Sequence, residues 1–105
     1  MFVFGGAGSV LLKTARTSGT YTEYPVVADV DNDGSAEIVV VSDGLSSTSP
    51  SPTIQVVRDK TDRWIQPRRI WNQHTYHVTN VREDGTIPQV EKQYWKYLNT
   101  FRTNS

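Results

Sequence analysis

The 105-residue sequence contains no cysteine and only one methionine. Without cysteine, neither a disulfide framework nor a thiolate zinc site is available to stabilise so small a domain. No apolar run approaches the roughly 18 residues of a membrane-spanning helix, and residues 1–12 lack the charged start and long apolar centre of a signal peptide. We therefore expect no membrane insertion, and we expect any export signal to lie outside this chain.

The formal charge of the chain is zero, but its charges are unevenly distributed. Residues 1–52 carry two basic and six acidic side chains, a net charge of −4, whereas residues 53–105 carry nine basic and five acidic ones, a net charge of +4. The longest run of basic residues is Arg68-Arg69, which is too short for the electrostatic footprint of a nucleic-acid-binding protein. We therefore expect no nucleic-acid partner.

What the sequence does contain is β-branched residues: thirteen valines and twelve threonines. Branched side chains fit a pleated sheet surface and lose rotamer freedom in a helix. A chain of this length forms at most one domain with a modest core. The composition predicts an all-β protein.

Four acidic side chains surround one glycine between two apolar segments: Asp29, Asp31, Asp33 and Glu37, with Gly34 in the middle. Carboxylates packed together repel one another, at a cost of about 4 kcal/mol for two unit charges 4 Å apart at an effective dielectric constant near 20. A divalent cation removes this repulsion. Calcium accepts six to eight oxygen ligands in flexible geometry, which suits alternating carboxylates better than the strict octahedron of magnesium does. We therefore predict a calcium site.

The order of the residues suggests a role for each. Side-chain oxygens come from Asp29, Asp31, Asp33 and Glu37, and Ser35 offers its backbone carbonyl. The loop is not an EF-hand, because that motif has a glutamate at position twelve, where this chain has Val40. An acidic surface turn is the alternative interpretation, since aspartate, asparagine and glycine are common in ordinary turns.

Short β-branched segments separated by turn residues predict three hairpins: residues 2–14, residues 24–42 with the acidic loop at its tip, and residues 53–66. Residues 45–52 form a polar connection that contains two prolines. The stretch from Pro25 to Gln66 has the length of one propeller blade, about 40–45 residues with four antiparallel strands. The pattern predicts propeller-blade-like sheets that amount to about one and a half repeats.

The segment Val26–Val40, VVADVDNDGSAEIVV, resembles the FG-GAP or VCBS-type repeat of bacterial surface proteins and integrin-like β-propellers. The preceding strand-turn-strand from Val3 to Leu12 is also similar to the lead-in of such a repeat. The resemblance implies a blade-like fold, an extracellular or cell-surface location, and calcium ligation at the five positions named above, although the last ligand in these repeats is commonly aspartate rather than glutamate. Residues 68–80, RRIWNQHTYHVTN, resemble a tail that follows such repeats in predicted secreted proteins of myxobacteria and similar bacteria.

The C-terminal tail leaves several interpretations open. His74 and His77 are three residues apart, but without a third ligand a structural role among Asn72, Gln73 and Tyr76 is favoured over a transition-metal pair. Apolar residues from Val90 onward recur at helical spacing and predict a short amphipathic helix, with an extended strap as the alternative. We expect residues 1–66 to form the repeat region and residues 67–105 to be a tail that packs on the sheet or seals it.

The large aromatic residues allow two functional interpretations. One is a carbohydrate-binding surface and the other is packing in the core; the residues concerned are Trp64, Trp71, Tyr76, Tyr94, Trp95 and Tyr97, of which Trp64, Trp71 and Tyr76 are the candidate ligand-binding residues. No serine lies in a nucleophile elbow, and carboxylates saturated by calcium are poor bases, so we expect no enzyme activity. The sequence favours a calcium-stabilised structural or adhesion module whose partner is another protein, the remaining blades of a parent chain or a second copy. A carbohydrate-binding, lectin-like propeller module is the alternative.

Overall fold

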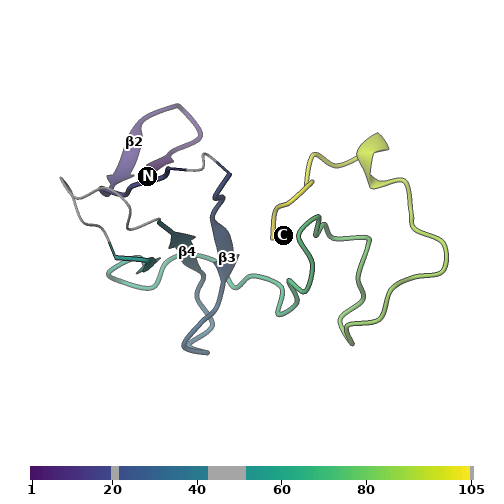
Figure 1. Ribbon diagram of the computed structural model, residues 1–105. Helices are drawn as coiled ribbons and strands as arrows, with labels where there is room; N and C mark the ends of the chain where they lie inside the picture. Colours follow the sequence, from purple (N-terminus) through teal and green to yellow (C-terminus); the bar gives the residue numbers. More distant parts are fainter. Residues whose placement is uncertain (20–21, 43–51, 105) are drawn as a thin grey trace. The chain divides into compact units, whose positions relative to one another are not determined.

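The protein is described by a computed structural model, which covers residues 1–19, 22–42 and 52–104 (Figure 1). Within these residues, five short strands form two sheets, one of two strands in the order β1-β2 and one of three in the order β3-β4-β5. The strands are β1 (Phe2–Phe4), β2 (Val10–Lys13), β3 (Val26–Ala28), β4 (Glu37–Val41) and β5 (Ile54–Val57), and a single 3₁₀ turn, η1, covers Tyr94–Lys96. The predicted all-β class is confirmed. The propeller-blade arrangement stays a prediction.

The described residues belong to two compact units, and β4 and β5 each contribute to both. Unit 1 consists of Met1–Tyr24 and Val40–Gln55, and unit 2 consists of Pro25–Val39 and Val56–Ser105. The predicted division of the chain after residue 66 stays a prediction. The predicted polar connection 45–52 lies outside the described residues, apart from Pro52. No helix in the described part of the chain is long and apolar enough to cross a membrane.

In unit 1, β1 and β2 form the predicted antiparallel hairpin. Val3 pairs with Leu12, and the register shifts by one residue before Phe4. The glycine turn is closed by hydrogen bonds from the Gly5 N–H to the Ser9 carbonyl and from the Gly8 N–H to the Gly5 carbonyl, both 2.8 Å long. Gly8 has a φ of 81°, a conformation that favours glycine over residues with a side chain.

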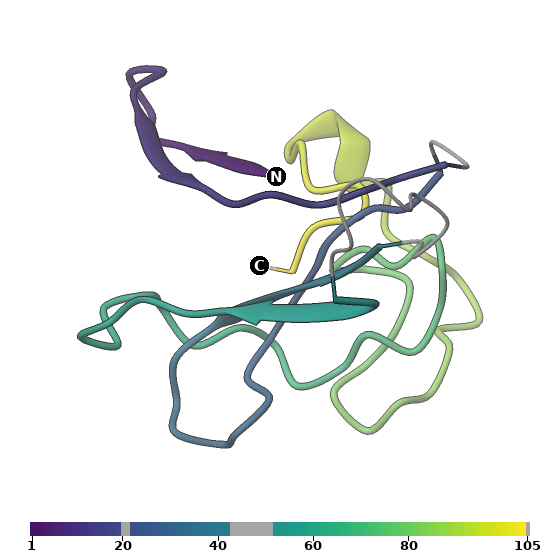
Figure 2. The same ribbon diagram turned by 60° about the vertical axis from the view of Figure 1, so that its left-hand side comes forward.

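The predicted hairpin around the acidic loop is also confirmed. β3 pairs antiparallel with β4, with Val26 opposite Val39, Val27 opposite Ile38 and Ala28 opposite Glu37. The β-branched residues of both strands suit a pleated, half-buried surface. This register places the first residue of β4, Glu37, beside the last residue of β3, so both ends of the acidic loop are fixed by strand pairing (Figure 2).

The third predicted hairpin is wrong. β5 is a neighbour of β4, and residues 63–66 form no strand. The Asp59 carboxylate holds the segment in a tight turn instead: it accepts hydrogen bonds from the Arg63 backbone N–H at 3.1 Å and from the Arg63 guanidinium at 2.8 and 2.7 Å. The amide that would begin a returning strand is therefore already bonded. The sheet has three strands where a four-stranded blade was expected.

Residues 58–104, all in unit 2, follow a long irregular path that is interrupted only by η1 (Figure 2). Arg68 organises this path. Its guanidinium donates hydrogen bonds to the Tyr76 hydroxyl at 3.1 Å and to the backbone carbonyls of Val78 and Val81, both at 3.0 Å. Tyr76 and Val81 are fully buried, so aromatic and aliphatic side chains form a core around the charged Arg68 guanidinium.

The predicted amphipathic helix from Val90 is wrong, because only the turn Tyr94–Lys96 is helical. Val90 and Tyr97 are both more than four-fifths exposed, so the apolar stripe does not lie against a core that would stabilise a helix. Aromatic residues are also mediocre helix formers. The tail is instead fastened near its end, where the Asn104 side chain donates hydrogen bonds to the carbonyls of Val27, at 2.8 Å, and Arg68, at 2.9 Å.

Candidate metal centre

The acidic loop is shaped by two residues with positive φ. Asn32 has a φ of 62° and Gly34 a φ of 93°, and asparagine and glycine are the residue types that adopt this region most readily. Together they fold residues 29–36 back on themselves between β3 and β4. The Asp29 and Asp31 side chains accept hydrogen bonds from amides inside this loop.

Three of the predicted ligands come together. Asp29, Asp31 and Glu37 each place a carboxylate oxygen within 4.8 Å of the other two. Glu37 is buried, Asp29 is half-buried and Asp31 is exposed, so the group opens from the base of the loop toward solvent. At this separation the three negative charges repel one another, and a divalent cation would neutralise them.

The Glu37 carboxylate is the most informative member of this group. The residue is only 1% exposed. One of its oxygens, Oε2, accepts a hydrogen bond from the Val30 backbone N–H at 2.9 Å. The other, Oε1, is buried and has no hydrogen-bond donor among the described residues. A buried carboxylate oxygen without a partner is costly, and a bound cation would supply the missing partner.

Backbone amides fix the orientation of the Asp29 side chain. Its two oxygens accept hydrogen bonds from the Asp33 N–H at 3.2 Å and from the Gly34 N–H at 3.0 Å. The Asp33 N–H is shared with Asp31 Oδ1 at 3.3 Å. These bonds preorganise two carboxylates with loop amides and leave further lone pairs free for a cation. The donor set is all oxygen and carries three negative charges, which fits a hard cation.

The two remaining predicted ligands stand apart from this group. Asp33 is exposed, and its Oδ1 accepts the Ser35 N–H at 2.7 Å. Ser35 is buried, and its hydroxyl donates to the Asp62 carbonyl at 2.9 Å. Ligation by Asp33 and by the Ser35 carbonyl stays a prediction.

Sequence reasoning missed Arg58, whose guanidinium lies 3.4 Å from Asp31 Oδ2. Both side chains are about half exposed, so the ion pair is weak. Its position nevertheless matters, because Arg58 supplies part of the countercharge that a metal would otherwise provide. The strand β5, directly before Arg58, brings this cation beside the loop, which no local pattern in the sequence indicates.

The three candidate carbohydrate-binding residues differ in burial. Trp64 and Trp71 are half-buried. Tyr76 is fully buried and stacks on Trp71 with ring centroids 5.0 Å apart. Its part in a sugar-stacking surface is therefore corrected: the Tyr76 ring is a core residue.

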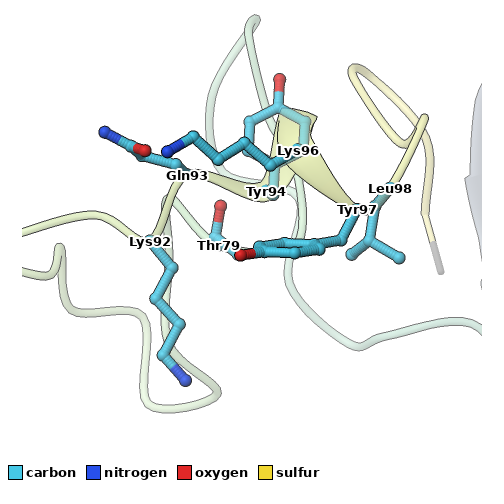
Figure 3. A pocket seen from close by; sticks show the side chains of 7 residues that line it. All are labelled: Thr79, Lys92, Gln93, Tyr94, Lys96, Tyr97 and Leu98. Atoms are coloured by element: carbon cyan, nitrogen blue, oxygen red, sulfur yellow. The ribbon is translucent and has the colours of Figure 1, made fainter.

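Two further residues of the predicted carbohydrate-binding surface, Tyr94 and Tyr97, line a pocket that the sequence did not indicate. The pocket has a volume of about 380 Å³ and is lined by Thr79, Lys92, Gln93, Tyr94, Lys96, Tyr97 and Leu98. Figure 3 shows the rings of Tyr94 and Tyr97 at the centre and the Lys92 amine extending away from them. Tyr97 is 86% exposed, and the neighbouring Trp95 is 61% exposed.

His77 has an acidic partner that its sequence neighbours do not provide. The ring of this buried residue lies 2.5 Å from Glu91 Oε1 through Nε2, and 2.9 Å from the Thr75 carbonyl through Nδ1. It also stacks on Tyr94 with ring centroids 4.2 Å apart. The expected structural role of His77 agrees with these contacts, although the expected partners do not.

No protein-family profile matches the chain, and no curated protein sequence matches it. A solved structure does match: the crystal structure of the V. cholerae biofilm matrix protein Bap1, at 31% sequence identity and a TM-score of 0.75, over 93% of this chain. The chain is similar to a segment of a biofilm matrix protein. It spans only 17% of the length of Bap1. The finer resemblance to FG-GAP or VCBS-type repeats stays a prediction.

Proposed function

We propose that this chain is a calcium-stabilised structural or adhesion module of an extracellular or cell-surface bacterial protein. The observation that carries the proposal is the buried, unpartnered oxygen of Glu37 within 4.8 Å of two further carboxylates. The similarity to the biofilm matrix protein Bap1 supports the extracellular and adhesive part of it. The proposed role is structural rather than enzymatic, because carboxylates saturated by calcium are poor bases.

In this proposal Asp29, Asp31 and Glu37 hold the calcium ion, and Asp33 with the Ser35 carbonyl completes the shell. When bound, the ion supplies two positive charges that cancel the repulsion between the carboxylates. The chain's own residues position the ligands. The β3–β4 pairing sets the distance between the two ends of the loop, and the Asp33 and Gly34 amides orient Asp29. Binding to the folded form alone contributes about 2.7 kcal/mol when calcium is a hundredfold above its dissociation constant.

The partner proposed is another part of a longer parent chain, such as further blades, or another protein. In unit 1 the β1–β2 hairpin exposes more than half of each of Phe2, Phe4, Val10 and Leu11. A lone two-stranded hairpin is marginal in water, so this apolar surface needs a cover. A second copy of the chain is the other candidate cover, and the molar mass measured by light scattering distinguishes monomer from homo-oligomer.

Thermal unfolding in calcium and in chelator tests the metal site. Asp31→Ala should lower the melting temperature in calcium and abolish its shift on addition of EGTA. Asp84→Asn is the matched control, because Asp84 is an exposed loop carboxylate outside the acidic loop, and its side chain accepts hydrogen bonds from the Thr86 backbone amide and hydroxyl. If the melting temperatures of wild type and Asp31→Ala respond identically to the chelator, the assignment of the calcium site is wrong.

A second candidate function, carbohydrate binding, is favoured by the pocket beside η1. Its volume is in the range of small-ligand sites, and the exposed rings of Trp95 and Tyr97 offer flat apolar faces next to the polar side chains of Gln93 and Lys96. A glycan array in calcium buffer tests this candidate. Glycan binding that is lost in Tyr97→Ala but kept in Trp64→Ala supports carbohydrate binding. If the wild-type chain binds no glycan, only the architectural role remains.

A further inference from the structure

The environment of His77 contains only acceptors around the imidazole nitrogens. Nδ1 faces the Thr75 backbone carbonyl at 2.9 Å, and Nε2 faces Glu91 Oε1 at 2.5 Å. A backbone carbonyl never donates a hydrogen, and an ionised carboxylate does not either. A neutral imidazole carries one N–H, so it can satisfy only one of these two oxygens. Both bonds form together when the ring carries two N–H groups and a positive charge.

Glu91 is held in its ionised form by the same contacts. Its Oε1 accepts a hydrogen bond from the Thr79 hydroxyl at 2.7 Å in addition to the one from His77. Burial raises the pKa of Glu91, but the hydrogen bonds from Thr79 and His77 outweigh it and leave the pKa below its ordinary value. When the imidazole carries a proton on both nitrogens, the contact is a short, partly buried ion pair.

The ion pair lies against the only helical turn in the described part of the chain. The His77 ring stacks on Tyr94, the first residue of η1, and is tilted against Phe101 at 5.8 Å between ring centroids. Tyr94 in turn accepts backbone hydrogen bonds from the Tyr97 and Leu98 amides at 2.9 and 2.8 Å. Glu91 and the Tyr94 phenol are the titratable groups that the described structure places against His77.

We propose that His77 and Glu91 form a proton-operated latch that holds the η1 turn and the pocket beside it. With His77 charged, the imidazolium ties the chain at residue 91 to residues 75–79, and Tyr94 is stacked in place. When the imidazole loses this proton, one N–H donor is lost. One of the two contacts then lacks a donor, and any bond that the neutral ring still makes to Glu91 is weaker than the ion pair that it replaces, so the η1 turn is held less tightly. Thr79 and Tyr94 also line the pocket, so the shape of the pocket follows the protonation of His77.

Hydrogen exchange on the 105-residue chain tests the latch at the amides of Lys96, Tyr97 and Leu98, which are bonded within or next to η1. After correction for the intrinsic pH dependence of exchange, these amides should exchange about tenfold faster or more once His77 is neutral, the factor expected for losing one charge-assisted hydrogen bond. In His77→Phe, which keeps an aromatic ring for stacking but has no donor and no titration, they should exchange fast at every pH. In His74→Gln, a change at the other, exposed histidine, the pH response should be retained.

A second variant separates the ion pair from general packing. Thr79→Val removes the neutral hydrogen bond to Glu91 and should leave the pH response in place, whereas Glu91→Gln removes the charge and should flatten it. The nitrogen chemical shifts of the imidazole in the wild-type chain report the protonation directly, and they do so even if His77→Phe fails to fold. Two protonated ring nitrogens in the latched state support the latch. A neutral ring in that state, or a pH response of residues 96–98 that persists in His77→Phe, overturns it.

Discussion

The Glu37 carboxylate reaches from the start of β4 to the Val30 backbone N–H, which donates to Oε2 at 2.9 Å, while Oε1 is buried with no donor among the described residues. One side chain thus links the two ends of the acidic loop. Its second carboxylate oxygen is buried at the base of the loop and lacks a hydrogen-bond donor among the described residues. Asp29 and Asp31 add their charges within 4.8 Å. This relationship is the basis of the predictions on the metal.

The first prediction is that Glu37→Gln separates metal binding from folding. The amide oxygen can still accept the Val30 N–H, so the loop should keep its closure, but the buried negative charge disappears. Without calcium the variant should be at least as stable as wild type, and its melting temperature should not respond to calcium. Thermal unfolding with and without EGTA measures both effects. A calcium-dependent shift equal to that of wild type would exclude Glu37 as a ligand.

The second prediction concerns Arg58, which lies 3.4 Å from Asp31. A cation on this carboxylate competes with a metal for the same charge. Because exposed ion pairs contribute roughly 0–1 kcal/mol, Arg58→Gln should tighten calcium binding by up to about fivefold. Arg63→Gln is the control, since Arg63 pairs with Asp59 outside the loop. Weaker calcium binding in Arg58→Gln would mean that the arginine supports the site rather than competing for it.

The third prediction is the acid resistance of the turn at residues 59–63. The side-chain hydrogen bonds from Arg63 are the main reason why the pKa of Asp59 lies below its ordinary value of 3.8. A carboxyl group with a lowered pKa contributes stability that is present above the unfolded value and lost only as the pH falls through the lower, folded one. The Arg63 amide should therefore stay protected in hydrogen exchange below pH 3.8. Protection that is lost above this pH, or that is unchanged in Asp59→Asn, would contradict the account of the turn.

The fourth prediction is that Arg68→Lys destabilises the chain. Arg68 donates to the Tyr76 hydroxyl and to two backbone carbonyls, and its Nε lies 2.6 Å from Glu83 Oε1. A lysine cannot reproduce a planar fork of donors, so it leaves buried acceptors without partners, at a cost of about 2–4 kcal/mol. Arg69→Lys, at the exposed neighbouring position, is the matched control and should cost little. Denaturant unfolding measures both, and equal stabilities would show that Arg68 does not organise this region.

The features that local sequence determines were predictable. The β1–β2 and β3–β4 hairpins follow from β-branched segments interrupted by glycine-rich or acidic turns, and both form as expected. The spacing of the acidic side chains predicts a metal site, and three of the five predicted ligands, Asp29, Asp31 and Glu37, do lie together. The strand expected at residues 63–66 fails for a local reason as well: an aspartate four residues before an arginine forms a closed turn, and that pair could have been recognised.

The features that depend on distant residues could not be predicted in this way. Asn104 bonds the Val27 carbonyl across 77 residues, and Arg58 meets Asp31 across 27. No periodicity in the sequence predicts such contacts. The pairing of His77 with Glu91 is similar: a histidine near polar neighbours predicts hydrogen bonds in general, but the identity of the acceptor is decided by how residues 75–94 fold.

Calorimetric titration of calcium into the chelator-treated chain tests the central claim most directly. We predict heat that fits one site per chain, with a dissociation constant suited to extracellular calcium, about 10⁻⁴ to 10⁻³ M, and no such heat in Glu37→Gln. A wild-type chain that gives no binding heat and no calcium-dependent rise in melting temperature, or a variant that binds as wild type does, would contradict the claim.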